Sequence, residues 1–177
     1  DISILFTDAE EALNFDPFEY YELPAQSDIV KKYEMAYKEN CKQNPDSVNM
    51  TGIYVTLISG LIDIYGWDML LLAAGTDPVR FGEVANRYAK FIQHYYDALA
   101  KADVPVVMVH DDIVWTAGPF INPDWYREYV FPNYKNYFAP LLESGKKILF
   151  TSDGDYTEFI DDIADCGVHG FVMEPMT

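Results

Sequence analysis

The stretch KKILFTSDGDYTEFIDDIADCGVHGFVMEP, residues 146–175, decides the fold class of this chain. It begins with an apolar run, KKILF, whose composition predicts a strand. The polar segment TSDGD, residues 151–155, follows, and residues 156–165 then carry apolar side chains at helical spacing as far as Gly167. A second short apolar run, GFVME, comes next. Strand, helix and strand in so short a segment predict a βαβ unit with two parallel strands.

The same alternation runs along the rest of the chain. Further strands are expected at residues 50–58 and 104–110, and the segment ISILF, residues 2–6, is a candidate fifth strand. Helices are expected at residues 28–41, at residues 57–75 with a break at Gly66, after the cap Asp77-Pro78, and after Asn122-Pro123 with a break at Pro132. This order predicts an α/β fold with a parallel sheet, either doubly wound or a TIM barrel. A complete TIM barrel needs ~250 residues, so this chain alone would not close one.

Composition and charge narrow the classes of function. The chain has 177 residues, of which 50% are hydrophobic, and a formal net charge of −17 from 29 acidic and 12 basic residues. Nucleic acids and anionic membrane surfaces need a basic face, so neither is expected as a partner. Two cysteines far apart, Cys41 and Cys166, favour a reducing, cytoplasmic setting over a disulfide framework. The longest apolar segment, residues 57–75, contains Asp63 and Asp68 and is interpreted as a core helix.

Polar residues gather where the predicted strands end. His110, Asp111 and Asp112 follow one strand, Thr151, Asp153 and Asp155 follow the next, and Glu174 ends the last. In α/β folds the site forms beyond the carboxyl ends of parallel strands. A ring of carboxylates there suits general acid–base catalysis, a metal ion or a cationic substrate.

Several of these residues also have a purely structural interpretation. Asp155 is well placed to cap the following helix, and Gly154 suits a turn. One member of the pair Asp111-Asp112 is expected to bond backbone amides, and a histidine at a strand end is more often structural than a ligand. Asp153 is the hardest to explain structurally, because it shares strand parity with Thr151 and both would then face one cavity. P-loop, GxGxxG and GxSxG motifs and zinc-type Cys/His spacing are absent from the sequence.

Two segments taken together resemble the uroporphyrinogen decarboxylase-like superfamily. These are HDDIVWTAGPFINPDWYREYVFPNYKNYF, residues 110–138, and GKKILFTSDGDYTEFIDDIADCGVHGFVMEP, residues 145–175. The FDP triplet at 15–17 and the Asp77-Pro78 helix also fit. The resemblance implies a TIM (β/α)8 barrel, of which residues 1–177 would be a single, incomplete domain holding the central strands and lacking the first and last ones. The superfamily contains decarboxylases and corrinoid-dependent methyltransferases.

The resemblance also separates the branches of the superfamily. Its methyltransferases hold zinc with a His-x-Cys pair at the positions of Thr151 and Asp153, so zinc-thiolate chemistry is not expected here, and Asp153 is the candidate ligand for any metal. The HDDIVW turn and the scarcity of arginine argue against a highly anionic tetrapyrrole substrate. The leading hypothesis is therefore a corrinoid-linked methyltransferase acting on a small methylated compound, such as an aryl methyl ether or a methylamine.

In this hypothesis the candidate catalytic residues are Asp153, Asp111 and Asp112. The candidate substrate-binding residues are His110, Trp115, Thr151 and Glu174, with Trp115 and Phe120 supplying an apolar mouth. A corrinoid protein would be the partner, and a homodimer stays open. Two alternatives remain: a cofactor-independent decarboxylase of the uroporphyrinogen type, and a non-catalytic barrel that binds a small molecule or a partner.

Overall fold

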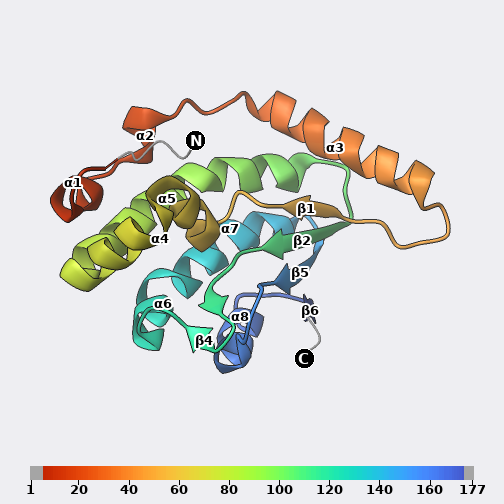
Figure 1. Cartoon of the computed structure of the whole chain (residues 1–177). Helices are drawn as coiled ribbons and strands as arrows, with labels where there is room; N and C mark the ends of the chain where they lie inside the picture. The colour runs from red at the N-terminus through yellow and green to blue at the C-terminus, as the bar shows by residue number, and fades with distance from the viewer. Residues whose placement is uncertain (1–5, 174–177) are drawn as a thin grey trace.

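Four parallel strands form the centre of the molecule. The computed structural model describes residues 6–173. The sheet has the order β1-β2-β5-β6, and its strands are β1 (Thr51–Ile53), β2 (Val106–His110), β5 (Lys147–Thr151) and β6 (Gly170–Val172) (Figure 1). Across the sheet Ile53 lies beside Val109, and Val109 lies beside Phe150. The parallel sheet predicted from the sequence is thereby confirmed.

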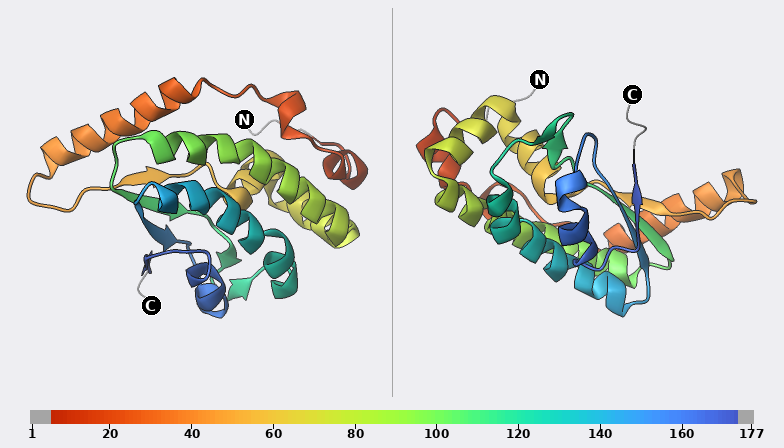
Figure 2. Two further views of the ribbon diagram at one scale, coloured as in Figure 1. Left: turned by 180° about the vertical axis from the view of Figure 1, so that it is seen from behind. Right: turned by 90° about the horizontal axis from the view of Figure 1, so that it is seen from below.

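Helices cover one face of this sheet. Views from the front and from behind show α5 (Pro78–Lys101) and α7 (Phe131–Glu143) packed on the same side of the strands (Figure 2). The alternation in β2 agrees, because Val107 and Val109 are buried whereas Met108 and His110 are partly exposed. Within residues 6–173 the opposite face carries no helix. An unbroken apolar run such as that of β2 is typical of a parallel strand covered on both faces, and the described part of the chain covers one of them.

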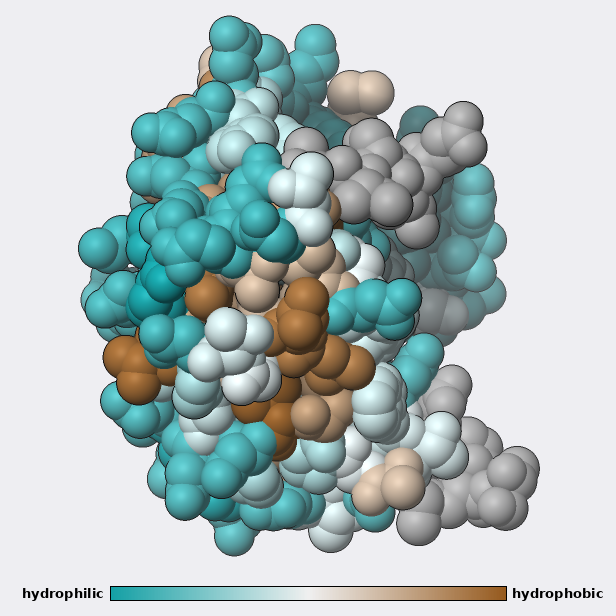
Figure 3. Space-filling view, turned by 60° about the vertical axis from the view of Figure 1, so that its left-hand side comes forward, coloured by the Kyte–Doolittle hydropathy of each residue, from teal (hydrophilic) through white to brown (hydrophobic). Residues whose placement is uncertain are grey.

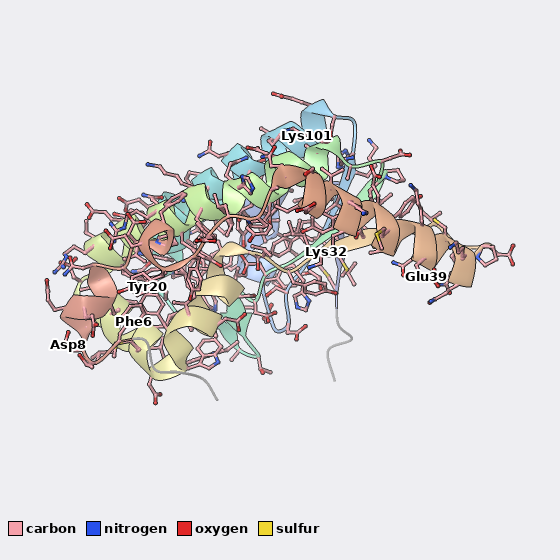
Figure 4. The ribbon with its side chains drawn as sticks, turned by 90° about the horizontal axis from the view of Figure 1, so that it is seen from above. Phe6, Asp8, Tyr20, Lys32, Glu39 and Lys101 are labelled. Atoms are coloured by element: carbon pink, nitrogen blue, oxygen red, sulfur yellow. The ribbon has the colours of Figure 1, made fainter. Side chains whose placement is uncertain are left out.

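The remaining elements surround this layer. They are α1 (Ala9–Leu13), α2 (Pro17–Tyr20), α3 (Gln26–Gln43), α4 (Leu57–Thr76), the hairpin of β3 (Val114–Trp115) and β4 (Gly118–Pro119), α6 (Pro123–Tyr129), the 3-10 helix η1 (Thr157–Phe159) and α8 (Ile160–Ala164). Helix α3 packs against α5, and its carboxyl-terminal part, which carries Glu39, extends beyond the rest of the molecule (Figure 4).

Local sequence signals explain where the helices begin and bend. The Asp77 side chain accepts a hydrogen bond from the Arg80 amide at 3.0 Å, and Pro78 occupies the first turn of α5, as expected. Gly66 adopts φ 66° and kinks α4 at the predicted break. By length and composition α4 could span a membrane, but it is kinked and much of it is buried against its neighbours, so α4 is a core helix.

Two boundaries differ from the expectation, and one predicted strand is not tested. The strand predicted at 50–58 is only Thr51–Ile53, because the chain leaves the sheet at Tyr54 and α4 already begins at Leu57. The helix predicted at 156–165 is divided into η1 and α8. The candidate strand ISILF lies outside the described residues except for Phe6, which is buried.

Asp111 connects three of these elements. Asp111 follows β2 directly. Its carboxylate accepts hydrogen bonds from the amides of the first three residues of α4, Leu57, Ile58 and Ser59, at 3.1, 3.2 and 2.7 Å. The hydroxyl of Tyr134 on α7 donates to the same carboxylate at 2.6 Å. The side chain is completely buried. Burial raises the pKa of Asp111, and the hydrogen bonds from Tyr134 and the α4 amides oppose that rise.

We expect Asp111→Asn to lower the free energy of unfolding by about 2–4 kcal/mol, because an amide removes the charge and turns one acceptor into a donor that faces the α4 amides. Tyr134→Phe removes one of the four hydrogen bonds and should cost about 1–2 kcal/mol. Urea unfolding followed by circular dichroism measures both values. Asp68→Asn, an exposed change on α4, is the control and should stay within about 0.5 kcal/mol of the parent. Parent-like stability of Asp111→Asn would show that this carboxylate does not anchor α4.

Candidate functional site

Two loops at the carboxyl ends of β2 and β5 form one structural unit. The Asp111 amide donates to the Thr151 carbonyl at 3.1 Å, and the Ile113 amide donates to the Ser152 hydroxyl at 3.1 Å. The Asp155 amide donates to the Trp115 carbonyl at 3.3 Å. These hydrogen bonds fix the turn after β2 against the TSDGD loop. Side chains from both loops are therefore presented at one edge of the sheet.

His110, Asp112 and Asp153 come together at this edge, and we call them the His110 group. His110 Nε2 lies 3.0 Å from Asp112 Oδ1 and 3.8 Å from Asp153 Oδ1. The Asp153 amide donates to Asp112 Oδ1 at 3.2 Å, and the Ser59 hydroxyl accepts from the Asp112 amide at 2.8 Å. The exposed fraction of the side chain is 26% for His110, 40% for Asp112 and 62% for Asp153. The group is thus held by backbone contacts and open to solvent on one side.

The other residues proposed from the sequence lie elsewhere. Asp111 is buried beneath the turn and does not join the His110 group. The Thr151 side chain is buried, although Thr151 pairs with His110 in the sheet register. Asp155 accepts from the Thr157 amide at 3.0 Å, and its hydrogen bonds to Thr157 lower the pKa of Asp155. Asp155 therefore bonds the first amide of η1, although Tyr156 is the residue that directly precedes this helix. This contact agrees with the structural interpretation of Asp155 rather than with a role in the exposed group. Glu174 lies outside the described residues.

Aromatic side chains border the same edge. The rings of Trp67, Trp115 and Phe120 pack together, with centroids 5.5, 5.0 and 5.6 Å apart in the three pairs. Both tryptophans are substantially exposed. Tyr54, also exposed, has its ring centroid 5.6 Å from that of His110. Trp115 and Phe120, the two residues expected from the sequence to supply an apolar mouth, lie against each other. We call Trp67, Trp115 and Phe120 the aromatic cluster.

Trp67 and Tyr54 were missed by sequence reasoning. Trp67 belongs to residues 57–75, which the sequence predicts to be a core helix, but it directly follows the kink at Gly66. The expected break at Gly66 was the available signal that the helix changes direction there. Tyr54 belongs to the strand predicted at residues 50–58, whereas in the structure it follows the strand end.

The side that comes forward from the left of Figure 1 shows a central apolar patch bordered by hydrophilic residues (Figure 3).

The His110 group also has the composition of a metal site. One ligand atom from each of His110, Asp112 and Asp153 lies within 4.8 Å of the others. One imidazole nitrogen and two carboxylate oxygens suit a hard or borderline divalent cation. Thr151 and Asp153 offer no thiolate, so the donors at this sheet edge are nitrogen and oxygen atoms only among the described residues.

Gly154 tests how tightly the two loops are joined. It adopts φ 95°, and a Cβ atom there would lie 2.4 Å from the Trp115 carbonyl oxygen. We expect Gly154→Ala to lower the free energy of unfolding by about 2–4 kcal/mol and to change the fluorescence of Trp115. Gly145, at φ 78° with no neighbour within 4 Å, provides the matched control, and Gly145→Ala should cost only about 1 kcal/mol. Equal losses in the two variants would mean that the contact with Trp115 does not constrain the loop.

Comparisons with known proteins bear on the family and the fold of this chain. The model of the family described as uroporphyrinogen decarboxylase (URO-D) matches residues 8–177. Among solved structures, a methyltransferase from Methanosarcina mazei is similar with a TM-score of 0.61 and 14% sequence identity; the alignment covers 88% of this chain and 45% of that chain. The comparison with curated proteins finds no match.

These comparisons show that the four parallel strands and their helices belong to a larger fold. The family fold is a TIM barrel, and the chain spans less than half the length of the methyltransferase that it resembles. The described sheet is accordingly part of such a barrel, with its helices on the outer face and the His110 group at the carboxyl edge. Because the family model matches nearly the whole sequence, the chain belongs to the uroporphyrinogen decarboxylase (URO-D) family.

Proposed function

We propose that this chain carries catalytic residues of a methyltransferase that removes a methyl group from a small methylated compound. One observation carries the proposal: the imidazole of His110 lies between two carboxylates at the sheet edge where the aromatic cluster is exposed. The structural likeness to a methyltransferase is in keeping with it, and that likeness concerns the fold.

The chemistry assigns a role to each residue. When a methyl group leaves an ether oxygen or an amine nitrogen, that atom gains electron density and must take up a proton. His110 is the residue placed to supply this proton, since histidine is the most common general acid in enzymes. Asp112, 3.0 Å from Nε2 and itself fixed by Ser59 and Asp153, would orient the ring. Asp153, the most exposed of the three, would contact the substrate.

The aromatic cluster would provide the apolar surroundings that methyl transfer needs. Trp67, Trp115 and Phe120 can exclude water from the methyl group and so prevent its loss to solvent. A corrinoid carried by a partner protein would supply the cobalt centre that accepts the methyl group. If the His110 group holds a divalent cation, the same three side chains would be its ligands.

A tetrapyrrole decarboxylase is less well supported by the described residues. A substrate with several carboxylates needs cationic partners, and all three arginines are engaged elsewhere. Arg80 pairs with Glu10 at 2.8 Å, and Arg127 contacts Asp162 at 3.1 Å. Arg87 donates to the carbonyls of Phe15 and Leu13. Within residues 6–173 no arginine is therefore left for a polyanionic substrate.

The direct test is methyl transfer from candidate donors to a reduced Co(I) corrinoid by the purified protein. We expect His110→Gln to lower kcat about 10²–10⁴-fold with an aryl methyl ether, because the departing phenolate then receives no proton. The control substitution Asp68→Asn should leave kcat unchanged. Turnover of uroporphyrinogen without a corrinoid would contradict the proposal.

A second methyl donor distinguishes the loss of proton donation by His110 from a general loss of structure in the variant. Methyl iodide releases iodide, which needs no proton, so its rate should be nearly the same for the parent and for His110→Gln. Equal losses with the ether and with methyl iodide would show that His110 does not act as the acid. Asp153→Asn should raise KM for the ether more than it lowers kcat, in line with a role in binding.

A further inference from the structure

We propose that a separate cavity in this chain binds a methylated ammonium ion. The cavity lies between α4, α5 and the segment that follows α2, and its volume is about 290 Å³. Five aromatic side chains line it: Tyr21, Tyr54, Tyr88, Phe91 and Tyr95. A cavity of this size is at the small end of ligand pockets, so the occupant is a small molecule or one side chain. We call it the tyrosine cavity.

The aromatic wall is continuous. The Phe91 ring centroid lies 6.2 Å from that of Tyr21, 6.3 Å from that of Tyr88 and 6.4 Å from that of Tyr95. Aromatic faces attract cations through their quadrupole, and a wall of several rings is how proteins recognise quaternary ammonium groups. Tyr88 and Phe91 are almost fully buried, so their rings are held in place before any ligand arrives.

A close helix contact shapes the wall. A Cβ atom on Gly60 would lie 2.2 Å from the Tyr88 hydroxyl oxygen, so glycine at this position lets Tyr88 lie directly against α4. Burial, with a further contribution from the carboxylates of Asp111 and Asp63, raises the pKa of Tyr88. The Tyr88 ring therefore stays neutral at physiological pH and presents an uncharged aromatic surface.

The charges around the cavity favour a cation. Two carboxylates, Glu22 and Asp63, belong to its lining, and both residues are exposed at the surface. The lining contains no lysine or arginine. The net charge of −17 adds a negative field over the whole molecule. An anionic ligand would be repelled here, whereas a methylated ammonium ion, which is weakly hydrated, gains from both the rings and the carboxylates.

The tyrosine cavity is distinct from the His110 group but touches its boundary. Tyr54 lines the cavity, and the same ring lies 5.6 Å from the His110 ring. Asp112 and Asp153 do not line the cavity. The binding site goes beyond the proposed methyl transfer and does not depend on it, since binding can be measured without turnover.

The test is isothermal titration of the purified protein at low ionic strength with three ligands of similar size. Choline and its uncharged isostere 3,3-dimethylbutan-1-ol have nearly the same shape, and glycine betaine adds a carboxylate. We expect choline to bind at least about tenfold more tightly than the isostere, because only choline carries the charge. Glycine betaine should bind more weakly than choline, because its carboxylate meets Glu22 and Asp63. Equal affinities for choline and the isostere would overturn the proposal.

Variants locate the binding site. Asp63→Asn should weaken choline binding about fivefold or more and leave the isostere unaffected, whereas Asp68→Asn, an exposed change on the same helix outside the lining, should alter neither. Tyr95→Leu should also weaken choline binding, and circular dichroism verifies that each variant is folded. Equal effects of Asp63→Asn and Asp68→Asn would exclude the tyrosine cavity as the site.

A peptide with one trimethyllysine distinguishes the two sources of the cation. Binding no tighter than that of choline assigns the cavity to free small molecules, and clearly tighter binding assigns it to a methylated protein side chain. Either result supports the cation site, and failure of both ligands to bind overturns it. Choline binding by a protein without methyl-transfer activity would leave this site standing and remove only the proposed function.

Discussion

The buried carboxylate of Asp111 is the constraint on which the site depends. A charge removed from water is tolerated only where donors replace the lost hydration. Here three amides of α4 and the Tyr134 hydroxyl supply that replacement. The end of β2, the start of α4 and the amino-terminal part of α7 are thereby fixed to one another. The direction in which the chain leaves β2 follows from this single set of contacts.

The position of Asp111 also determines where its neighbours point. Alternate residues of an extended segment face opposite sides. With Asp111 turned beneath the sheet edge toward α4, His110 and Asp112 face the other way, where their side chains meet at 3.0 Å. The adjacent aspartates thus have different tasks, one in holding the fold and one in the exposed group. The two aspartates of the TSDGD loop differ in the same way: Asp153 lies beside His110, and Asp155 accepts a hydrogen bond from the first amide of η1.

The sequence predicted those features that local chemistry determines. An Asp-Pro pair favours a helix start and a glycine weakens a helix interior, so the start of α5 at Asp77-Pro78 and the kink at Gly66 could be predicted from local sequence alone. The alternation of strands and helices predicted the parallel sheet for the same reason. The choice between Asp111 and Asp112 could not be made, because it depends on the amides at the start of α4, more than fifty residues earlier in the chain. The tyrosine cavity could not be predicted for the same reason, because residues as far apart in the sequence as Tyr21 and Tyr95 line it together.

The distribution of acidic residues connects the two proposed sites. Part of the acidic excess serves the fold, since Asp8, Asp16 and Asp77 accept hydrogen bonds at helix starts. Asp153, Asp63 and Glu22 instead are exposed and lie next to aromatic rings or an imidazole. Carboxylates beside aromatic surface repel anions and favour cations or neutral apolar groups. A methylated ammonium ion satisfies both demands, because it is charged at its centre and apolar at its periphery. Tyr54, which contributes to the surroundings of both sites, is where binding of such an ion would first affect His110.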